Sequence, residues 1–276
     1  MPTTSPDPQN KMTWDHSSDQ NFIDYYALES LTPETVQRFT LVRDKTLWLL
    51  SKLNTDKNCI KMHVADIGCG TGTQSRLWAK LGHKVFGLDV NAPLIEIAKA
   101  RAIDDGIDIQ FDIGSATELP YSDASMDIAL LPELLEHVAD WQSCLNEGMR
   151  ILKPGGLLYV STTNYLCPIQ DEFSLPLYSW YPGFLKRHYE RLAITTRQEI
   201  VNYCKYPAVN WFSYYSLKAY FEHRNFRCLD RFDTLQTENI GTLNKLVVRA
   251  IRLLPPLRFV GHVFTRGSWL FAIKAH

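Results

Sequence analysis

The stretch Val64-Ala65-Asp66-Ile67-Gly68-Cys69-Gly70-Thr71-Gly72 decides the fold of this chain. A short apolar run ends in an acidic residue and three alternating glycines, which let the main chain turn sharply and let a ligand approach it. Apolar residues return afterwards at helical spacing, at Leu77, Trp78 and Leu81. The stretch therefore predicts a strand, a glycine loop and a helix. The loop lies at the carboxyl end of the strand, where open α/β sheets bind ligands.

The spacing of the glycines separates two kinds of cofactor. The dinucleotide fingerprint Gly-x-Gly-x-x-Gly needs its third glycine at position 73, where this chain has Thr73. Asp-x-Gly-x-Gly-x-Gly after a strand instead resembles the first motif of class I S-adenosylmethionine (SAM)-dependent methyltransferases. The resemblance continues in order over roughly residues 61–165, through apolar strands and a Lys-Pro-Gly-Gly turn at Lys153–Gly156.

This resemblance implies the fold and the cofactor. The expected fold is α/β, a Rossmann-like, doubly wound sheet of seven strands, mostly parallel with an antiparallel closing strand. The closing strands are expected at residues 226–232 and 268–274. The expected cofactor is SAM, with S-adenosylhomocysteine as the product.

Asp89 is the predicted ribose ligand. It ends the second apolar strand, 89 − 72 = 17 residues beyond Gly72, and an acid roughly 20 residues beyond such a loop accepts hydrogen bonds from ribose hydroxyls. The alternative, a helix N-cap, is less favoured because Asn91 fills that role before Pro93. Val90, beside the acid, is predicted to bind the cofactor as well.

The resemblance assigns the remaining cofactor contacts. Ser115 stands where the family has an acid that contacts the adenine amine. Its hydroxyl can still accept from an amine, although a purely turn-forming serine is the alternative. The other predicted contacts, to the methionine part, the adenine and the end of the fourth strand, are Asp66, Gly68, Gly70, Gly72, Ala116 and Leu131.

His137 is the predicted catalytic residue. It follows the fourth strand, and an imidazole with its ordinary pKa near 6.5 suits a general base for an oxygen acceptor. The alternative is that His137 only supports the local helix. Glu133, Glu136 and His137 also resemble the segment that is associated with a divalent metal in ubiquinone-biosynthesis O-methyltransferases, and one helical turn would place them on one face. The same acids fit an ordinary helix start, so no metal ligand is assigned.

The chain divides into three predicted parts. Residues 1–20 are polar and predict a disordered tail, residues 21–60 predict N-terminal cap helices, and residues 61–276 predict the methyltransferase domain. An aromatic-rich insertion at about 163–215 is expected to cover the mouth of the site as a substrate lid, which suits an apolar or ring-containing acceptor. The alternative is a small hydrophobic subdomain without substrate contact.

Charge and cysteine usage limit the partners. The net charge of −1 argues against nucleic acid. Residues 246–264 combine apolar residues with arginines, which suits either contact with a membrane surface or packing against the domain itself or a dimer partner. No apolar run approaches the ~18 residues of a membrane span. The six cysteines are scattered without Cys-x-x-Cys, which predicts reduced thiols and a cytoplasmic location.

The predicted function is O-methylation of a small or lipid-like acceptor: an aromatic molecule, a quinone precursor or a glycan. Two alternatives remain. One is a SAM-binding protein that transfers no methyl group and acts through partners. The other is a nicotinamide-dependent oxidoreductase, which Thr73 disfavours. The sequence does not indicate the acceptor atom or the oligomeric state.

Overall fold

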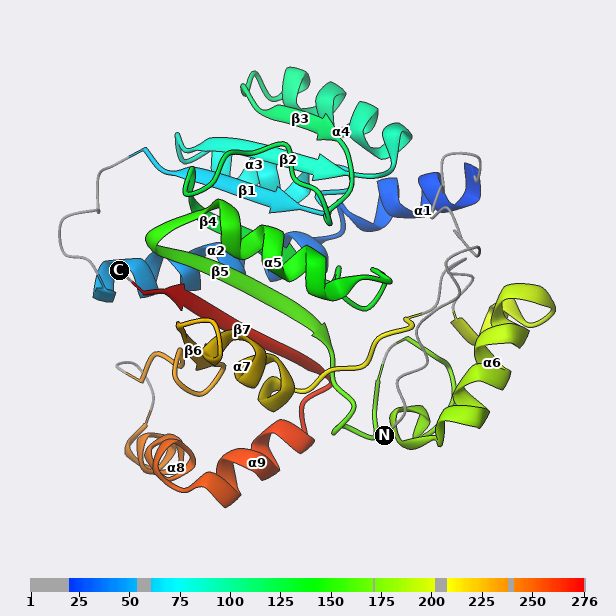
Figure 1. The fold of residues 1–276 in the computed structure, drawn as a ribbon, viewed down its shortest axis with the longest axis vertical. Coiled ribbons are helices and arrows are strands. Elements are labelled where there is room, and N and C mark those ends of the chain that lie inside the picture. Colours follow the sequence, from blue (N-terminus) through cyan, green and yellow to red (C-terminus); the bar gives the residue numbers. More distant parts are fainter. Residues whose placement is uncertain (1–19, 54–60, 171, 202–207, 238–240, 276) are drawn as a thin grey trace.

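The computed structural model describes residues 20–53, 61–170, 172–201, 208–237 and 241–275. The predicted N-terminal tail therefore lies outside the described residues, apart from Gln20. Within the described ranges, one sheet runs through the molecule in the strand order β3-β2-β1-β4-β5-β7-β6 (Figure 1). The strands are β1 (His63–Ile67), β2 (Lys84–Asp89), β3 (Gln110–Ile113), β4 (Met126–Pro132), β5 (Leu152–Thr163), β6 (Phe226–Asp230) and β7 (Gly267–Lys274).

The strand directions confirm the predicted fold class. β1 pairs in parallel with β2 and β4, and the parallel pairing continues to β3 on one side and β5 on the other. β7 is antiparallel to both of its neighbours, β5 and β6. The antiparallel strand is thus inserted one position inside the edge. The carboxyl ends of β1, β2, β4 and β5 lie along one edge of the sheet, together with the start of β7.

Helices cover both faces of the sheet because the central strands bury both sets of side chains. Val64 and Ala65 of β1 point to opposite faces, and both are fully buried. One face packs against α2 (Pro33–Leu53) and α3 (Thr73–Ala79), through core residues that include Leu50 and Trp78. The other face packs against α5 (Trp141–Ile151) and α7 (Tyr214–Glu222). In Figure 1, α5 and α7 lie in front of the sheet. α4 (Ala92–Asp104) packs beside β2 and β3.

The predicted third strand is shifted in the structure. The apolar residues at 107–111 predict a strand over that range, whereas β3 begins at Gln110 and ends at Ile113. The Lys-Pro-Gly-Gly turn lies within β5 rather than ahead of it. Gly155 there has a φ of 70°, and a Cβ on Gly156 would lie 2.8 Å from the Lys153 carbonyl oxygen. Only glycine fits this irregular start, after which β5 runs straight to the site.

The remaining helices flank the sheet. α1 (Gln20–Glu29) precedes α2, and the short helices η1 (Tyr178–Trp180) and η2 (Gln198–Val201) accompany α6 (Gly183–Thr195). α8 (Thr242–Leu253) and α9 (Pro255–Val263) lie before β7 (Figure 1). No helix in the described ranges has both the length and the apolar character needed to cross a bilayer.

The aromatic insertion forms a hydrophobic cluster of its own. Phe173 stacks on Tyr178 with ring centroids 3.9 Å apart, and Tyr178 also contacts Trp211. Trp180 and Phe184 remain exposed. The cluster accounts for part of the aromatic content by packing alone. The two interpretations of the insertion, a substrate lid and a small hydrophobic subdomain, therefore both remain predictions. The predicted domain boundaries also remain predictions.

Candidate active site

The glycine loop connects β1 to α3 in a conformation that suits glycine. Gly68, Gly70 and Gly72 all have positive φ, at 75°, 51° and 74°. A Cβ on Gly72 would lie 2.9 Å from the side chains of Ala98 and Phe111, so this glycine also allows close packing. A Cβ on Gly70 would meet nothing within 4 Å. Gly70 therefore borders open space, where a ligand can approach the main chain.

Asp89 fastens this loop to the end of β2. Its Oδ2 accepts a hydrogen bond from the Gly70 amide at 2.8 Å, and its Oδ1 accepts one from the Asn91 amide at 2.9 Å. Asn91 is the N-cap of α4, because its side chain accepts from the Leu94 amide, so Asp89 is not needed as a cap. Burial raises the pKa of Asp89. Each carboxylate oxygen keeps a lone pair free for a further donor. Val90, next in the chain, is exposed.

Several polar side-chain atoms around the loop are buried and have no hydrogen-bond partner in the described part of the chain. Asp66 accepts from the Ser75 hydroxyl at 2.5 Å through Oδ2, while its Oδ1 has no partner. Burial raises the pKa of Asp66 to about 6, and the charge of Asp89 adds to the effect. The Thr71 hydroxyl and both amide atoms of Gln74 are likewise buried and unpaired. Buried polar groups are normally hydrogen-bonded, so this set fits a polar ligand at the loop.

Sequence reasoning missed two of these groups, Thr71 and Gln74. The signal available was their position, within the loop and in the first turn of α3. Together with Asp66 and Asp89 they offer carboxylate acceptors and amide donors. This donor set suits the charged and hydroxyl-bearing parts of a nucleoside amino acid such as SAM.

The segment after β3 adopts a local turn. The Ser115 hydroxyl lies 2.7 Å from the Thr117 hydroxyl and accepts from the Thr117 amide at 3.2 Å. The Gly114 amide donates to the Asp89 carbonyl at 3.0 Å, which holds the segment beside the end of β2. Ala116 packs against the core. The exposed Ser115 thus stabilises a local turn, as the alternative interpretation expects. Its contact with adenine stays a prediction.

The segment after β4 is not the helix start that the sequence predicts. Residues 133–140 form turns, and α5 begins only at Trp141, where Asp140 caps it by accepting from the Ser143 amide. Glu133 has a φ of 51°, which is incompatible with helix. The side chain of Leu131 is fully buried in the core, so its predicted cofactor contact is limited to the main chain.

The three candidate metal ligands consequently diverge. Glu133 forms an ion pair with Arg38 of α2 at 2.5 Å. Glu136 is buried and accepts from the Thr162 hydroxyl at 2.7 Å; burial raises its pKa to about 8. His137 is half-buried, and its amide donates to the Leu134 carbonyl. In the described residues no three such side chains come together as a metal-binding group. The role of His137 as a base stays a prediction.

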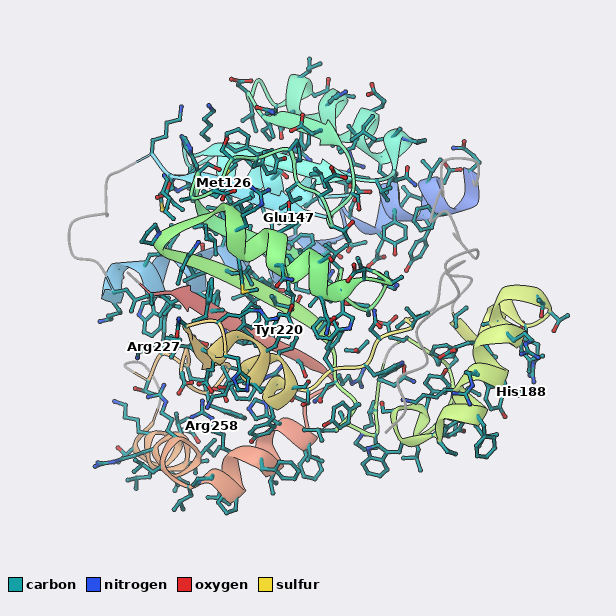
Figure 2. The ribbon with its side chains drawn as sticks, in the orientation of Figure 1. Met126, Glu147, His188, Tyr220, Arg227 and Arg258 are labelled. Carbon is teal, nitrogen blue, oxygen red and sulfur yellow. The ribbon has the colours of Figure 1, made fainter. Side chains whose placement is uncertain are left out.

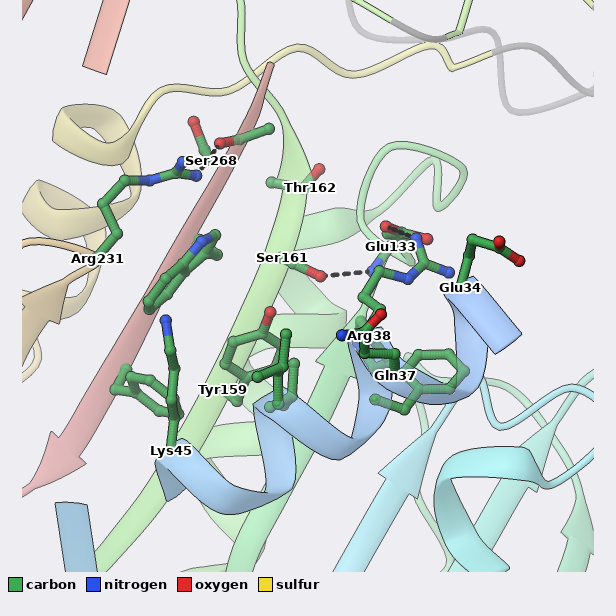
Figure 3. A pocket seen from close by; sticks show the side chains of 17 residues that line it. Glu34, Gln37, Arg38, Lys45, Glu133, Tyr159, Ser161, Thr162, Arg231 and Ser268 are labelled. Atoms are coloured by element: carbon green, nitrogen blue, oxygen red, sulfur yellow. Dashed lines mark hydrogen bonds and ion pairs between the residues drawn. The ribbon is translucent and has the colours of Figure 1, made fainter. Parts of the chain in front are cut away.

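A cavity of about 450 Å³ lies beside this segment. It is bounded by α2 on one side and by the ends of β4, β5 and β7 on the other (Figure 3). The glycine loop follows β1, the strand next to β4. The predicted cofactor site and the cavity therefore occupy neighbouring stretches of the same sheet edge.

The fold and the glycine loop define a nucleotide-binding α/β protein of the kind that binds a nucleoside at the switch point of its sheet. Residues 65–160 match the family described as a methyltransferase domain. The chain thus carries a methyltransferase domain, and the family and fold imply SAM as its cofactor.

Relatives and solved structures agree with this classification. The chain is 34% identical over 131 residues to a ubiquinone biosynthesis O-methyltransferase of Brucella anthropi, covering 46% of this chain and 52% of the relative. It is 38% identical over 103 residues to a protein of the same name from a Chelativorans species, covering 37% and 41%. The chain spans about half the length of these relatives or less.

The structural neighbours share the fold. A SAM-dependent methyltransferase from Aquifex aeolicus superposes with a TM-score of 0.52 at 13% identity, covering 91% of this chain and 98% of the other. A [4+2]-cyclase superposes with a TM-score of 0.51 at 17% identity, covering 84% and 81%. The second neighbour illustrates that this fold also hosts other chemistry, so the activity has to be argued from the site.

Proposed function

We propose that the protein is a SAM-dependent methyltransferase that methylates an oxygen atom of a small or lipid-like acceptor. The observation that carries the proposal is the glycine loop, with Asp89 bonded to Gly70 at 2.8 Å and unpaired buried polar groups beside it. The cavity along the same edge supports a separate place for the acceptor. When bound, SAM supplies an activated methyl group on a sulfonium.

The chain's own residues bind and orient the two reactants. In this proposal Asp89 and Val90 hold the ribose, Asp66 and the three loop glycines hold the methionine part, and Ser115 and Ala116 flank adenine. The acceptor lies in the cavity with its hydroxyl at the end beside β4. His137 does not line the cavity itself, so the hydroxyl has to extend beyond Pro132 for His137 to remove its proton. Holding the acceptor oxygen in line with the reacting bond supplies much of the rate gain, of order 7–11 kcal/mol in favourable cases.

The acceptor class rests on similarity and on the lining of the cavity. The relatives named for ubiquinone biosynthesis support a phenolic quinone precursor, ahead of other aromatic molecules or a glycan. Aromatic and aliphatic walls suit such a ring, among them Phe39, Val42, Tyr159, Trp269 and Phe271. A cytoplasmic location, predicted from the scattered cysteines, belongs to the same proposal.

Transfer of a labelled methyl group from SAM to a prenylated catechol tests the activity. Labelled product is expected from the wild type, and His137→Ala should lower kcat by about 10²–10⁴-fold if the imidazole removes the proton. His223→Ala, which changes an exposed histidine at the end of α7, is the matched control and should retain full activity. SAM binding without turnover of any phenolic acceptor would favour the binding-protein alternative instead.

The pair of helices α8 and α9 supports peripheral contact with an anionic membrane. Arg252 of α8 donates hydrogen bonds to the carbonyls of Phe232 and Leu235. Arg258 of α9, labelled in Figure 2, forms an ion pair with the buried Asp230 at 2.7 Å. These two arginines hold the helices on the domain. Large apolar residues instead face outward, which inverts the usual arrangement of a surface helix. They are Leu243, Leu246, Val247, Leu253, Leu257, Phe259, Val260 and Phe264.

The charge of this region is complementary to anionic lipid. Residues 241–276 contain six Lys or Arg residues and no Asp or Glu, in a chain whose net charge is −1. Arg252, Arg258 and Lys274 bond to the domain. Lys245 and Arg249 of α8 are instead exposed. Apolar side chains inserted between headgroups and basic residues beside phosphates are the two contributions to interfacial binding. A membrane-bound enzyme would also meet a lipid-like acceptor where that acceptor resides.

A further inference from the structure

The cavity under α2 has one end that carries two cationic side chains, Lys45 and Arg231. The Nζ of Lys45 lies 4.6 Å from the ring centroid of Trp269, and the guanidinium carbon of Arg231 lies 5.4 Å from the same centroid. In the described part of the chain, neither cation has a carboxylate within ion-pair distance. In Figure 3 the Arg231 guanidinium is directed toward Ser268, and Lys45 approaches from α2.

Arg231 is held in place but is only partly satisfied. It donates to the Gly267 carbonyl at 2.6 Å, whereas its Nε is buried and has no partner within the described ranges. Burial lowers the pKa of Lys45, and the charge of Arg231 lowers it further. Two cations against one aromatic ring repel each other, and an anion bound at this end of the cavity would reduce that cost.

The other end of the cavity differs in charge. There Arg38 is paired with Glu133, so the two charges cancel. Glu34 also lines this end of the cavity and adds a second carboxylate beside the Arg38–Glu133 pair. Between the ends, the walls are mainly apolar and include Val42 and Phe271. The cavity thus offers an apolar middle, an acidic end beside β4 and a cationic end beside β7. Its volume of about 450 Å³ is sufficient for a small ring-containing molecule.

We propose that the cavity binds a carboxylic acid with an aromatic or apolar body, its carboxylate lying at the cationic end that Lys45 and Arg231 form, and that this acid is the methyl acceptor. Binding of the acid follows from the cavity alone, whereas its role as acceptor rests on the proposed function. With the carboxylate beside Trp269, the opposite end of the molecule lies near Pro132, at the end of β4 next to the glycine loop. The reacting hydroxyl would then face the predicted cofactor site.

A matched pair of probes tests this inference by calorimetry. 6-Hydroxy-2-naphthoate and its neutral carboxamide share shape and hydroxyl and differ in the negative charge. The wild type should bind the naphthoate at least about tenfold more tightly, because a charge-assisted hydrogen bond is worth roughly 1.5–3 kcal/mol. Affinity should be unchanged with saturating S-adenosylhomocysteine, since the two sites are adjacent and separate.

Variants locate the bound carboxylate. Lys45→Met keeps the aliphatic stem and should reduce the preference for the acid to about twofold or less, while Arg231→Lys, which keeps the charge, should largely retain it. Lys52→Met, in the last turn of α2 and outside the cavity, is the control and should behave as the wild type. Circular dichroism and melting temperature establish that each variant is folded.

Three results would overturn the inference. They are equal binding of acid and amide, an unchanged preference in folded Lys45→Met, and competition between the naphthoate and S-adenosylhomocysteine. A tenfold preference for 2-naphthyl phosphate over the naphthoate would also contradict a carboxylate. In each case SAM binding by the same protein would leave the methyltransferase proposal intact, so the two failures are distinguishable.

Discussion

The carboxylate of Asp89, at the end of β2, holds the amide of Gly70 at 2.8 Å, in the loop that follows β1. One acid thus joins the ends of two neighbouring strands and fixes the loop that borders open space. Its free lone pairs remain available to a ligand at that position. Preorganisation of the loop and recognition of the ligand are therefore combined in a single side chain.

Glu136 makes stability depend on pH. Burial raises the pKa of Glu136 from its ordinary value of 4.5 to about 8, so between these values the folded state retains a proton that the unfolded state has lost. Stability should fall as pH rises through this window, by up to about 1.4 kcal/mol per pH unit from this group. Glu136→Gln keeps an acceptor for Thr162 and removes the charge. We expect it to be more stable than the wild type at pH 8, by about 2–4 kcal/mol, and similar at pH 4.5.

Urea denaturation at several pH values measures this difference, with Glu147→Gln as the control of opposite sign. Hydrogen bonds from Arg150 lower the pKa of Glu147, so its contribution is present at neutral pH and is lost in acid. Glu147→Gln should therefore lose stability mainly at pH 8. If Glu136→Gln left the pH profile unchanged, the assignment of a protonated buried acid would be wrong.

Asp230 should be essential for holding α9 on the domain. The carboxylate is fully buried and contacts His262 at 2.8 Å and Arg258 at 2.7 Å. Burial alone would raise its pKa, but the hydrogen bonds from His262 and Arg258 outweigh burial and hold the pKa at about 2. Asp230→Asn should cost about 3–5 kcal/mol, because it leaves a buried charge network incomplete.

Hydrogen exchange tests the structural consequence of that substitution. Amides of residues 255–263 should lose protection in Asp230→Asn before the central strands do. Asp123→Asn, which removes an exposed partner of Arg150, is the control and should cost at most about 1 kcal/mol. Uniform loss of protection across the sheet would contradict a local role.

Binding to vesicles tests the membrane surface on α8 and α9. Vesicles of phosphatidylcholine and phosphatidylglycerol should sediment the wild type, less so at high salt. Leu246→Gln with Val260→Gln should reduce binding by about tenfold or more, because burial of each such side chain contributes roughly 1.5–3 kcal/mol. Leu28→Gln, at a leucine on α1 that is even more exposed, is the control. Equal loss in the control, or equal binding to uncharged vesicles, would contradict the proposal.

The sequence was most informative where local chemistry leaves few choices. The three glycines and the apolar runs predicted the loop and the strands, the family resemblance predicted a mostly parallel sheet of seven strands, and Asn91 was correctly predicted to cap α4. The turn at residues 133–140 was missed. Its sequence is compatible with helix, and only tertiary contacts show otherwise: Glu136 turns inward to Thr162, and Glu133 adopts a positive φ beside Arg38.

The cavity was beyond sequence reasoning for a related reason. Lys45, Arg231 and Trp269 are far apart in the chain, and none belongs to a recognisable motif. They meet because β7 is inserted between β5 and β6 while α2 crosses that face. The apolar patterns predicted helices and strands near α2, β6 and β7, but which of their surfaces meet depends on the assembled fold.

Calorimetric titration of SAM and S-adenosylhomocysteine into the wild type, with NADH as control, tests the central claim most directly. The account predicts micromolar binding of both sulfur compounds and none of NADH, and a loss of about 10–100-fold in Asp89→Ala, since a charged acceptor of the ribose hydroxyls is removed. Asp105→Ala, which removes a surface partner of Arg76, should bind as the wild type does. Tight binding of NADH, or no binding of either sulfur compound to folded protein, would contradict the account.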